Sequence, residues 1–293
     1  MRTTAHQNSG PDFIGIGAQK AGTGWLYEQL RNHPDFWMPP MKELHYFDRI
    51  AANPQVQRSL PSARKEPDRI RIARNRARDQ RDADFLARFE RLCGSDMLNL
   101  EGYAALFAGK GESIAGDITP GYSTLDAPDV EKIVSRFPDV RVIFIARDPV
   151  ERAWSQLSMY IRRGLIDRFD PEAVDQIIAH LHRPEVRTRS YPSEIVRRWR
   201  RYLSADRFSV YFFDDLQRDP VRLRASIITF LGGNPNKSSE KLPPDYNAKA
   251  TKEKLTLTES ARNHLANFFK QELYACAQEL GGPAVDWPRR YHL

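Results

Sequence analysis

A lysine lies inside a glycine-rich turn near the start of the chain. Residues 13–17 form a short apolar run, and the loop GAQKAGTG and then Trp25, Leu26 and Leu30 at helical spacing follow it. Glycines let backbone N–H groups approach an anion, and the N-terminus of a following helix favours negative charge. Lys20 adds a positive charge inside this cradle. The pattern predicts an oxyanion site, and its alternative is an ordinary strand–helix turn with an exposed lysine.

A second cluster of the same character follows the clearest strand of the sequence, residues 141–146. Arg147 opens the turn RDP directly after this strand, and Ser155 comes two helical turns later. A guanidinium offers a planar fork for a phosphate, and the serine hydroxyl would face the same region. Alternatively, Arg147 pairs with Asp148 or Glu151, and Ser155 is a buried hydroxyl bonded to the backbone.

The segment KELHYFD carries the candidates for proton transfer. Glu43 could act as a general base through its carboxylate, and His45 could do so because imidazole titrates near neutrality. The alternatives are a surface pair between Glu43 and Lys42, and a core histidine between Tyr46 and Phe47.

Two common nucleotide-binding patterns fail at one position each. Gly17 and Gly22 have the spacing of a Walker A loop, but Thr23 stands where that loop has its lysine. Gly15 and Gly17 fit a dinucleotide fingerprint, but Lys20 replaces its last glycine. These departures disfavour an ordinary ATPase and an NAD enzyme, and a P-loop-like small-molecule kinase is kept as an alternative.

The elements that must position these residues alternate between strands and helices. Strands are expected at 13–17, 113–118, 141–146 and 208–213, and helices near 128–137, 150–161, 172–181, 192–203 and 220–231, with one further helix carrying Leu265 to Leu280. This order predicts an α/β fold: a single domain with a central, mostly parallel β-sheet flanked by helices. Ligands of such sheets bind beyond the carboxyl ends of the strands, where both charged turns fall.

Composition limits the class of protein further. The chain has 293 residues, of which 41% are hydrophobic and 28% charged, and its net charge is +7. No stretch reaches the ~18 apolar residues of a membrane span, and the first dozen residues hold no apolar segment. Cys93 and Cys276 are far apart, and no Cys/His cluster has zinc spacing. We therefore expect a cytoplasmic protein without integral membrane association and without a metal.

Residues 1–11 are expected to be flexible, and residues 12–293 to form one domain with a basic helical insertion at about 53–95. Residues 58–91 hold 11 basic and 6 acidic side chains. Such a surface attracts anions and could flank an acceptor cleft, although Arg69 to Arg81, which show no apolar stripe, also fit a solvated helix face. A non-enzymatic module that binds nucleic acid or an acidic surface is the third hypothesis, but no helix-turn-helix, RNP or zinc pattern supports it.

Several segments together resemble a known family. QKAGTGWLYEQL resembles the 5′-phosphosulfate loop of sulfotransferases that use 3′-phosphoadenosine 5′-phosphosulfate (PAPS), and RVIFIARDPVERAWSQLSMY resembles their 3′-phosphate strand and helix. KELHYFD, GDITPGYS, FFDDLQRDP and DWPRRY are similar to segments of the heparan sulfate branch, the glucosaminyl 3-O- and N-sulfotransferases. The segments occur in order from about residue 13 to 287.

The resemblance implies roles for particular residues. Lys20 would contact the phosphosulfate bridge, and the residues that line the same loop are Ala21, Gly22, Thr23, Gly24 and Trp25. The 3′-phosphate and the adenine would be held by Arg147, Ser155 and Phe213, and by Lys249 and Lys252 in a late loop that matches loosely. Glu43 matches the general base, with His45 as the alternative. Asp117, Thr119 and Tyr122 could orient the acceptor, but Ile118 stands where the family has a lysine.

The resemblance also implies the reaction. A sulfuryl group would pass in line from PAPS to a hydroxyl, or to an amine, of a carbohydrate, glycolipid or secondary-metabolite acceptor. Lys20 would stabilise the leaving phosphate, the product nucleotide would be 3′,5′-ADP, and no metal would be needed. The acceptor is expected to be a small molecule or carbohydrate, not nucleic acid.

Overall fold

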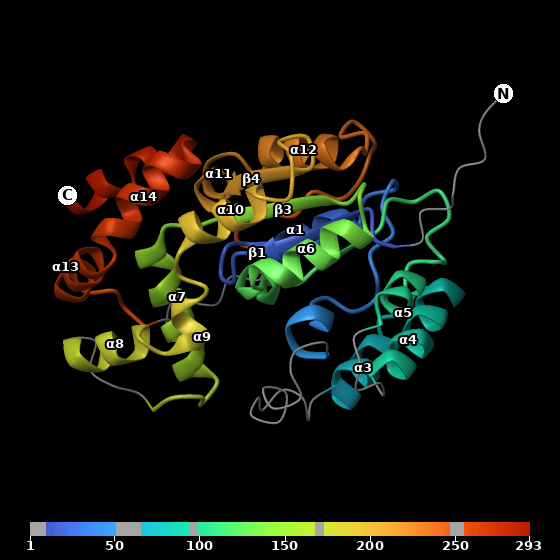
Figure 1. Ribbon diagram of the computed structural model, residues 1–293, viewed down its shortest axis with the longest axis horizontal. Helices are drawn as coiled ribbons and strands as arrows, with labels where there is room; N and C mark the ends of the chain where they lie inside the picture. The colour runs from blue at the N-terminus through green and yellow to red at the C-terminus, as the bar shows by residue number, and fades with distance from the viewer. Residues whose placement is uncertain (1–9, 51–65, 94–98, 168–172, 247–254) are drawn as a thin grey trace.

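Four parallel strands form the centre of the molecule, seen here in a computed structural model that describes residues 10–50, 66–93, 99–167, 173–246 and 255–293. The strands are β1 (Phe13–Gly17), β2 (Gly116–Ile118), β3 (Arg141–Ala146) and β4 (Phe208–Phe212), in the order β2-β1-β3-β4. Every neighbouring pair is parallel, so all four carboxyl ends lie at one edge of the sheet. The predicted α/β fold with a parallel sheet is confirmed (Figure 1).

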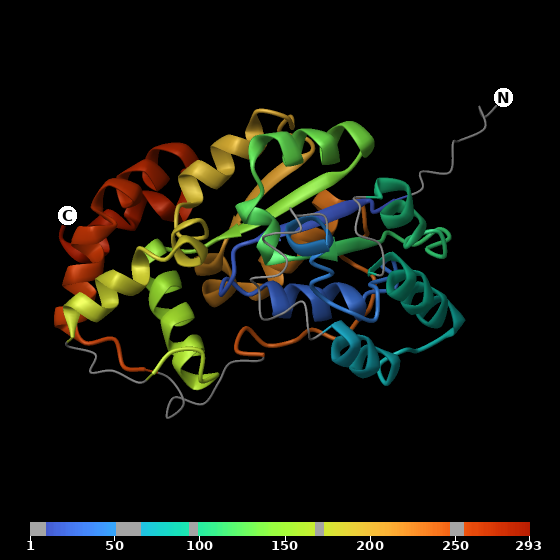
Figure 2. The ribbon, with the colours of Figure 1, turned by 60° about the horizontal axis from the view of Figure 1, so that its bottom comes forward.

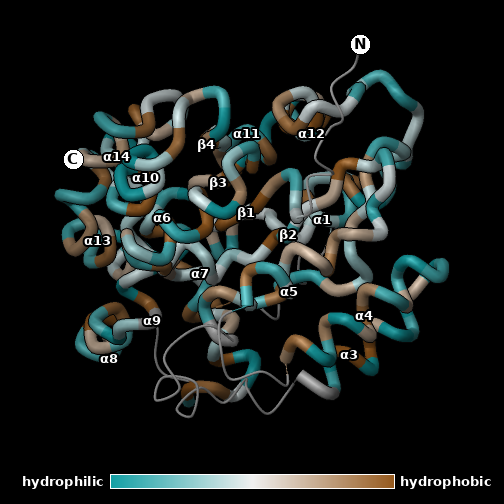
Figure 3. The backbone as a smooth tube through the Cα atoms, turned by 45° about the vertical axis from the view of Figure 1, so that its right-hand side comes forward, coloured by the Kyte–Doolittle hydropathy of each residue, from teal (hydrophilic) through white to brown (hydrophobic). Residues whose placement is uncertain are grey.

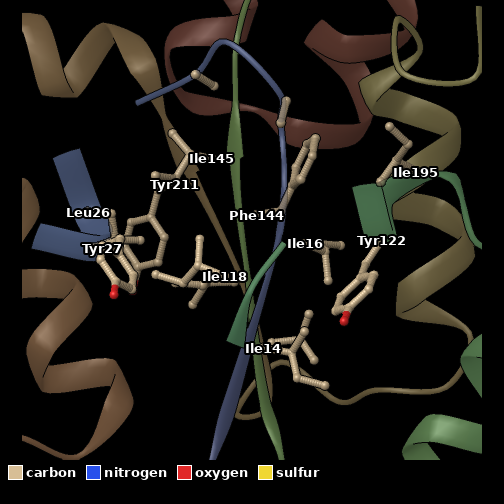
Figure 4. Packing of buried hydrophobic residues seen from close by; sticks show 14 of the residues in the cluster. Ile14, Ile16, Leu26, Tyr27, Ile118, Tyr122, Phe144, Ile145, Ile195 and Tyr211 are labelled. Carbon is tan, nitrogen blue, oxygen red and sulfur yellow. The ribbon is translucent and has the colours of Figure 1, made fainter. Parts of the chain in front are cut away.

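The central strands β1 and β3 are apolar except for Arg141 at the start of β3, because both faces of the sheet are covered. Ile14 and Ile16 of β1 point to one face together with Phe144 of β3, whereas Ile145 and Ile118 point to the other (Figure 4). All five of these side chains are at most 1% exposed. Figure 3 shows the apolar stretches gathered around these strands, with hydrophilic stretches mostly outside.

Helices cover each face. α1 (Thr23–Arg31) and α12 (Pro220–Leu231) pack together on one face, and α6 (Ala127–Arg136) and α10 (Pro192–Arg200) pack on the other. In Figure 2, α6 lies above the sheet and α1 lies below it. The sequence predicted the helices equivalent to α6, α10 and α12 to within a few residues.

Smaller groups of helices flank the sheet at both ends (Figure 1). One end holds α3 (Glu66–Arg74), α4 (Gln80–Cys93) and α5 (Leu100–Ala105), and the other holds α8 (Val174–Leu181), α9 (Pro184–Arg187), α13 (Glu259–Phe268) and α14 (Lys270–Leu280). α7 (Pro149–Arg162) leads away from the end of β3, and α11 (Phe213–Arg218) follows β4 directly. Short helical turns at Tyr46–Ile50, Pro120–Thr124, Gly282–Asp286 and Pro288–Tyr291 complete the described elements.

The structure corrects two expectations about helices. The arginine-rich segment does have an apolar stripe, since Ile70 and Ala73 of α3 are almost fully buried. The single C-terminal helix is two helices, because α13 ends at Phe268 and α14 begins at Lys270. Phe269 at the break is buried against Phe268 and Tyr191, and the apolar residues on either side face the same core, so their spacing does not reveal the break.

The chain is already anchored at Gly10, within the segment expected to be flexible. The Gly10 carbonyl accepts a hydrogen bond from Lys110, and both Gly10 and Pro11 are buried. Residues 1–9 lie outside the described part of the chain. Among the described helices, none is long and apolar enough to cross a membrane.

Candidate active site

A cavity of about 870 Å³ lies at the carboxyl edge of the sheet, which is the size of a site for a nucleotide-sized ligand. Its walls come from the loop after β1, from the start of α1, from α7, from α11 and from the loop before α13. Most of the residues singled out from the sequence line it: Lys20, Gly22, Thr23, Gly24, Trp25, Glu43, Arg147, Ser155 and Phe213. Ala21 is fully buried and is not among the lining residues.

The start of α1 is built to leave backbone N–H groups available. Gly22 precedes the helix with φ 86°, and a Cβ on it would approach Leu216 Cδ2 to 2.5 Å, so only glycine fits there. No side chain caps the helix, and its first turn has no acidic residue. A Cβ on Gly24 would meet no atom within 4 Å, because this glycine faces the cavity. The N-terminus of α1 therefore presents an open, electropositive cradle.

The two predicted anion-binding turns form a single site. Arg147 donates from Nη1 to the Lys20 carbonyl oxygen at 2.6 Å, and its guanidinium carbon lies 4.3 Å from the centre of the Phe213 ring. Nε of Arg147 is buried without a hydrogen-bond partner in the structure. Burial lowers the pKa of this guanidinium, whereas Glu151, 3.4 Å away, raises it. The expected pair with Glu151 exists, but it leaves Arg147 able to bind a phosphate.

Glu43 reaches the cavity wall with its carboxylate held between two groups. Oε1 lies 2.5 Å from Lys42 Nζ, and Oε2 lies 3.4 Å from His45 Nε2. The side chain is 39% exposed. Burial raises the pKa of Glu43, but Lys42 and His45 outweigh it and hold the pKa well below its usual range. The structure therefore agrees with both predictions for Glu43, since its carboxylate pairs with Lys42 and also lines the cavity.

His45 lies behind Glu43, and each of its two ring nitrogens lies near a carboxylate. Its Nδ1 is 2.9 Å from Oδ2 of Asp48, whose side chain is almost buried. His45 is 6% exposed and does not line the cavity. A chain of polar contacts therefore runs from Asp48 through the His45 ring to Glu43, which lines the cavity. The sequence analysis missed Asp48, although the aspartate three residues after the histidine in KELHYFD was a visible signal.

The three residues predicted to be catalytic have a left-handed backbone. Lys20, Glu43 and His45 have φ angles of 73°, 61° and 56°, and His292 is the one other non-glycine residue of the described chain with positive φ. Each such residue costs roughly 1–2 kcal/mol, so surrounding contacts must hold it. The Glu43 N–H donates to the Ile118 carbonyl at 3.2 Å, and Arg69 of α3 donates to the carbonyls of Lys42 and Glu43. Arg69 therefore belongs to the site's support rather than to a solvated helix face.

The structure does not bring Asp117, Thr119 and Tyr122 to the cavity. The Asp117 carboxylate accepts hydrogen bonds from Thr119 Oγ1 at 2.7 Å, from Tyr122 at 2.6 Å and from Tyr103 at 3.1 Å. Burial raises the pKa of Asp117, against these hydrogen bonds. Tyr122 in turn accepts from the Tyr46 N–H at 3.1 Å. These buried side chains hydrogen-bond to one another and to the backbone of the segment that carries Glu43, so they support that segment, and a role toward the acceptor stays a prediction.

The loop before α13 closes the cavity on one side. Trp25 Nε1 donates to the Leu242 carbonyl at 3.2 Å, and Trp154 Nε1 donates to the Leu255 carbonyl at 2.9 Å. The Leu255 N–H donates to Ser158 of α7 at 2.9 Å. Lys249 and Lys252 fall between these anchors, outside the described residues. Within the described ranges, no group of three or more His, Cys, Asp or Glu residues could hold a metal ion.

A pair of glycine substitutions in one loop should separate stability from anion binding. Gly22→Ala should lower the free energy of unfolding by about 1–3 kcal/mol, because the Cβ meets Leu216 and the φ angle is unfavourable. Gly24→Ala should leave the melting temperature unchanged or raise it, since alanine favours a helix and has room. Its Cβ would nevertheless obstruct an anion at the helix N-terminus and weaken binding of a phosphorylated ligand at least about tenfold. Thermal melts and calorimetric titrations check both, and equal anion affinity in Gly24→Ala and wild type would contradict the cradle.

Comparison with known proteins finds one matching family model and solved structures of similar fold. Residues 11–234 match the model of the group described as "Sulfotransferase family". The fold resembles a sulfotransferase from Alicyclobacillus acidocaldarius, with a TM-score of 0.64, 21% identity and coverage of 94% of this chain and 98% of that one. It also resembles the sulfotransferase domain of the Synechococcus PCC 7002 olefin synthase, with a TM-score of 0.56, 18% identity and coverage of 90% and 96%. No curated protein sequence matches the chain significantly.

Proposed function

Because the chain belongs to the sulfotransferase family and is a PAPS-dependent enzyme, we propose that it transfers the sulfuryl group of PAPS to a hydroxyl group of a carbohydrate or other small-molecule acceptor. The observation that carries the proposal is the single cavity in which Lys20, the open start of α1 and Arg147 meet. The alternative is that the same sulfuryl transfer takes place to an amine. The cytoplasmic location of the protein stays a prediction.

The residues of the cavity fit a donor with phosphates at two positions. The start of α1 and Lys20 would hold the 5′-phosphosulfate, because the helix has no cap of its own and the Cβ position of Gly24 is open. Arg147, with its unpartnered Nε, and Ser155 would hold the 3′-phosphate. Phe213 would provide an aromatic surface for the adenine, and Trp25, which is 2% exposed, would line the phosphosulfate end of the same cavity.

Lys20 would supply the main electrostatic contribution. In-line transfer through a loose transition state builds negative charge on the oxygen that leaves the sulfur. A fixed ammonium beside that oxygen stabilises the transition state more than the bound donor. The bond between Arg147 and the Lys20 carbonyl keeps the turn in place while this charge develops.

Glu43 would accept the proton of the acceptor hydroxyl. Its carboxylate lies on the cavity wall, whereas His45 lies behind it, so the geometry favours Glu43 as the base. Asp48 orients the imidazole so that Nε2 faces Glu43, and His45 is then a positioning residue. Lys42 holds one carboxylate oxygen and must share it when the acceptor binds.

Binding of the product nucleotide tests the proposal without knowledge of the acceptor. We expect 3′,5′-ADP to bind in calorimetry and to raise the melting temperature, because a ligand at about 100 times its Kd stabilises the folded state by about 2.7 kcal/mol. Mg-ATP should bind more weakly, since Thr23 replaces the Walker lysine. No binding of 3′,5′-ADP at millimolar concentration, or tighter binding of Mg-ATP, would overturn the donor assignment and favour the small-molecule kinase.

A further inference from the structure

The cavity continues along α7 well beyond the residues assigned to the donor. Its α7 lining runs from Glu151 through Ser155 and Met159 to Arg162, at spacings of three or four residues, so one face of the helix forms this wall. Arg163, the C-cap of the helix, lines the cavity as well. Arg162 and Arg163 lie seven and eight residues after Ser155, which places them about 10–12 Å further along the helix axis. Because α7 leads away from the sheet edge (Figure 1), this far end is separate from the turn at Arg147.

Two cations at this end, Arg162 and Arg163, have no counter-charge among the described residues. In the described residues no carboxylate lies within ion-pair distance of Arg162 or Arg163, and Asp167, the nearest acidic residue along the described chain, is not paired with either. Of the other charged groups that line the cavity, Glu43 pairs with Lys42 and Glu151 pairs with Arg147, whereas Asp245, on the loop before α13, has no ion pair within the described ranges. A basic residue at a helix C-terminus is favoured by the helix dipole, but that effect does not require a second arginine facing the same cavity.

In the basic region of α3 and α4, by contrast, most of the positive charges are paired within the protein. The arginines of these helices and of the turn between them bind partners within the protein: Arg69 the carbonyls of Lys42 and Glu43, Arg74 Glu90, Arg76 Glu28, Arg78 Asp82, and Arg81 Asp79. The uncompensated positive charge that faces the cavity is therefore on α7, not on the insertion.

We propose that Arg162 and Arg163 bind an anionic group of the acceptor, so that the preferred acceptor is a hydroxyl compound that also carries a carboxylate, phosphate or sulfate. This inference rests on the proposed function. Guanidinium groups form bidentate, charge-assisted hydrogen bonds with such oxyanions. Met159 of α7 lines the same cavity, and the apolar part of an acceptor can pack against it. The acceptor would be held by its charge at one end while its hydroxyl faces Glu43.

Matched pairs of acceptors test this. Methyl β-glucoside is compared with methyl β-glucuronide, and glucose with glucose 6-phosphate, each added to the 3′,5′-ADP complex in thermal melts and to the enzyme with labelled PAPS. We expect the charged member of at least one pair to bind and react in preference. The double variant Arg162→Gln/Arg163→Gln should lose at least about tenfold in affinity for that member, as for lost charge-assisted hydrogen bonds, and keep its melting temperature.

The control variant Arg71→Gln/Arg81→Gln removes the same charge from the exposed surface of α3 and α4 and should behave as wild type. Equal or better binding of the neutral members, no binding of any probe at millimolar concentration, or an unchanged charge preference in the α7 variant would overturn the proposal. A tenfold loss of 3′,5′-ADP affinity in that variant would assign the arginines to the donor instead. If the wild type does not bind 3′,5′-ADP at all, the proposed function fails first, and the two failures are distinct.

Discussion

Replacing Lys20 with alanine should lower kcat by about 10²–10³-fold or more, the loss seen when one preorganised donor is removed from a developing oxyanion. The ammonium acts where charge builds up, so the loss should fall on kcat more than on the Kd of 3′,5′-ADP. Arg147 binds the carbonyl of residue 20, not its side chain, so the turn should persist in the variant. Single-turnover transfer from labelled PAPS, with melting curves alongside, measures both effects.

Lys132→Ala provides the matched control, since it removes the same charge from an exposed position on α6, where Lys132 pairs with Asp129. This variant should retain full activity. If Lys20→Ala kept more than about a tenth of the wild-type kcat, Lys20 would not be the group that stabilises the leaving oxygen. A fall in melting temperature that matched the loss of activity would instead make Lys20 a structural residue of the turn.

The donor end of the site could be predicted from sequence because its signals are local. Each signal is contained in a short stretch of sequence: the apolar run of β1 is followed directly by the glycines before α1, and the apolar run of β3 is followed directly by the RDP turn. The rule that ligands bind beyond the carboxyl ends of parallel strands then brought Lys20 and Arg147 together, and the structure joins them by a hydrogen bond.

The supporting residues could not be predicted in the same way, because they depend on how distant elements dock. Arg69 reaches the carbonyl of Glu43 only through the packing of α3, which Ile70 and Ala73 anchor. The Asp117 carboxylate accepts a hydrogen bond from Tyr103 of α5, a helix that was not predicted from the sequence. The sequence around β2 therefore indicated the region of the fold in which Asp117 lies but not the hydrogen-bond partners of its side chain.

Replacing Glu43 with glutamine should lower kcat by about 10²–10⁴-fold, the usual contribution of a general base, and leave the Kd of 3′,5′-ADP unchanged. Glutamine keeps the shape of the side chain and an oxygen to accept from Lys42, but it cannot take up a proton. Asp245→Asn is the matched control, because Asp245 is another carboxylate of the cavity wall, contributed by the loop before α13. Comparable losses in both variants would show that the cavity needs negative charge in general, not a base at Glu43.

The pH profile of kcat separates Glu43 from His45. Lys42 and His45 hold the pKa of Glu43 well below its usual range despite burial, which raises it, so the carboxylate stays ionised as the pH falls and loses its charge only below that range. The wild-type rate should therefore show no loss from this group between about pH 8 and pH 5. An acidic limb with a midpoint near the ordinary imidazole value of about 6.5, absent from His45→Asn, would assign the base to His45. His45 lies between Glu43 and Asp48 and does not line the cavity. We therefore expect His45→Asn to lower kcat less than Glu43→Gln does and to keep the flat pH profile.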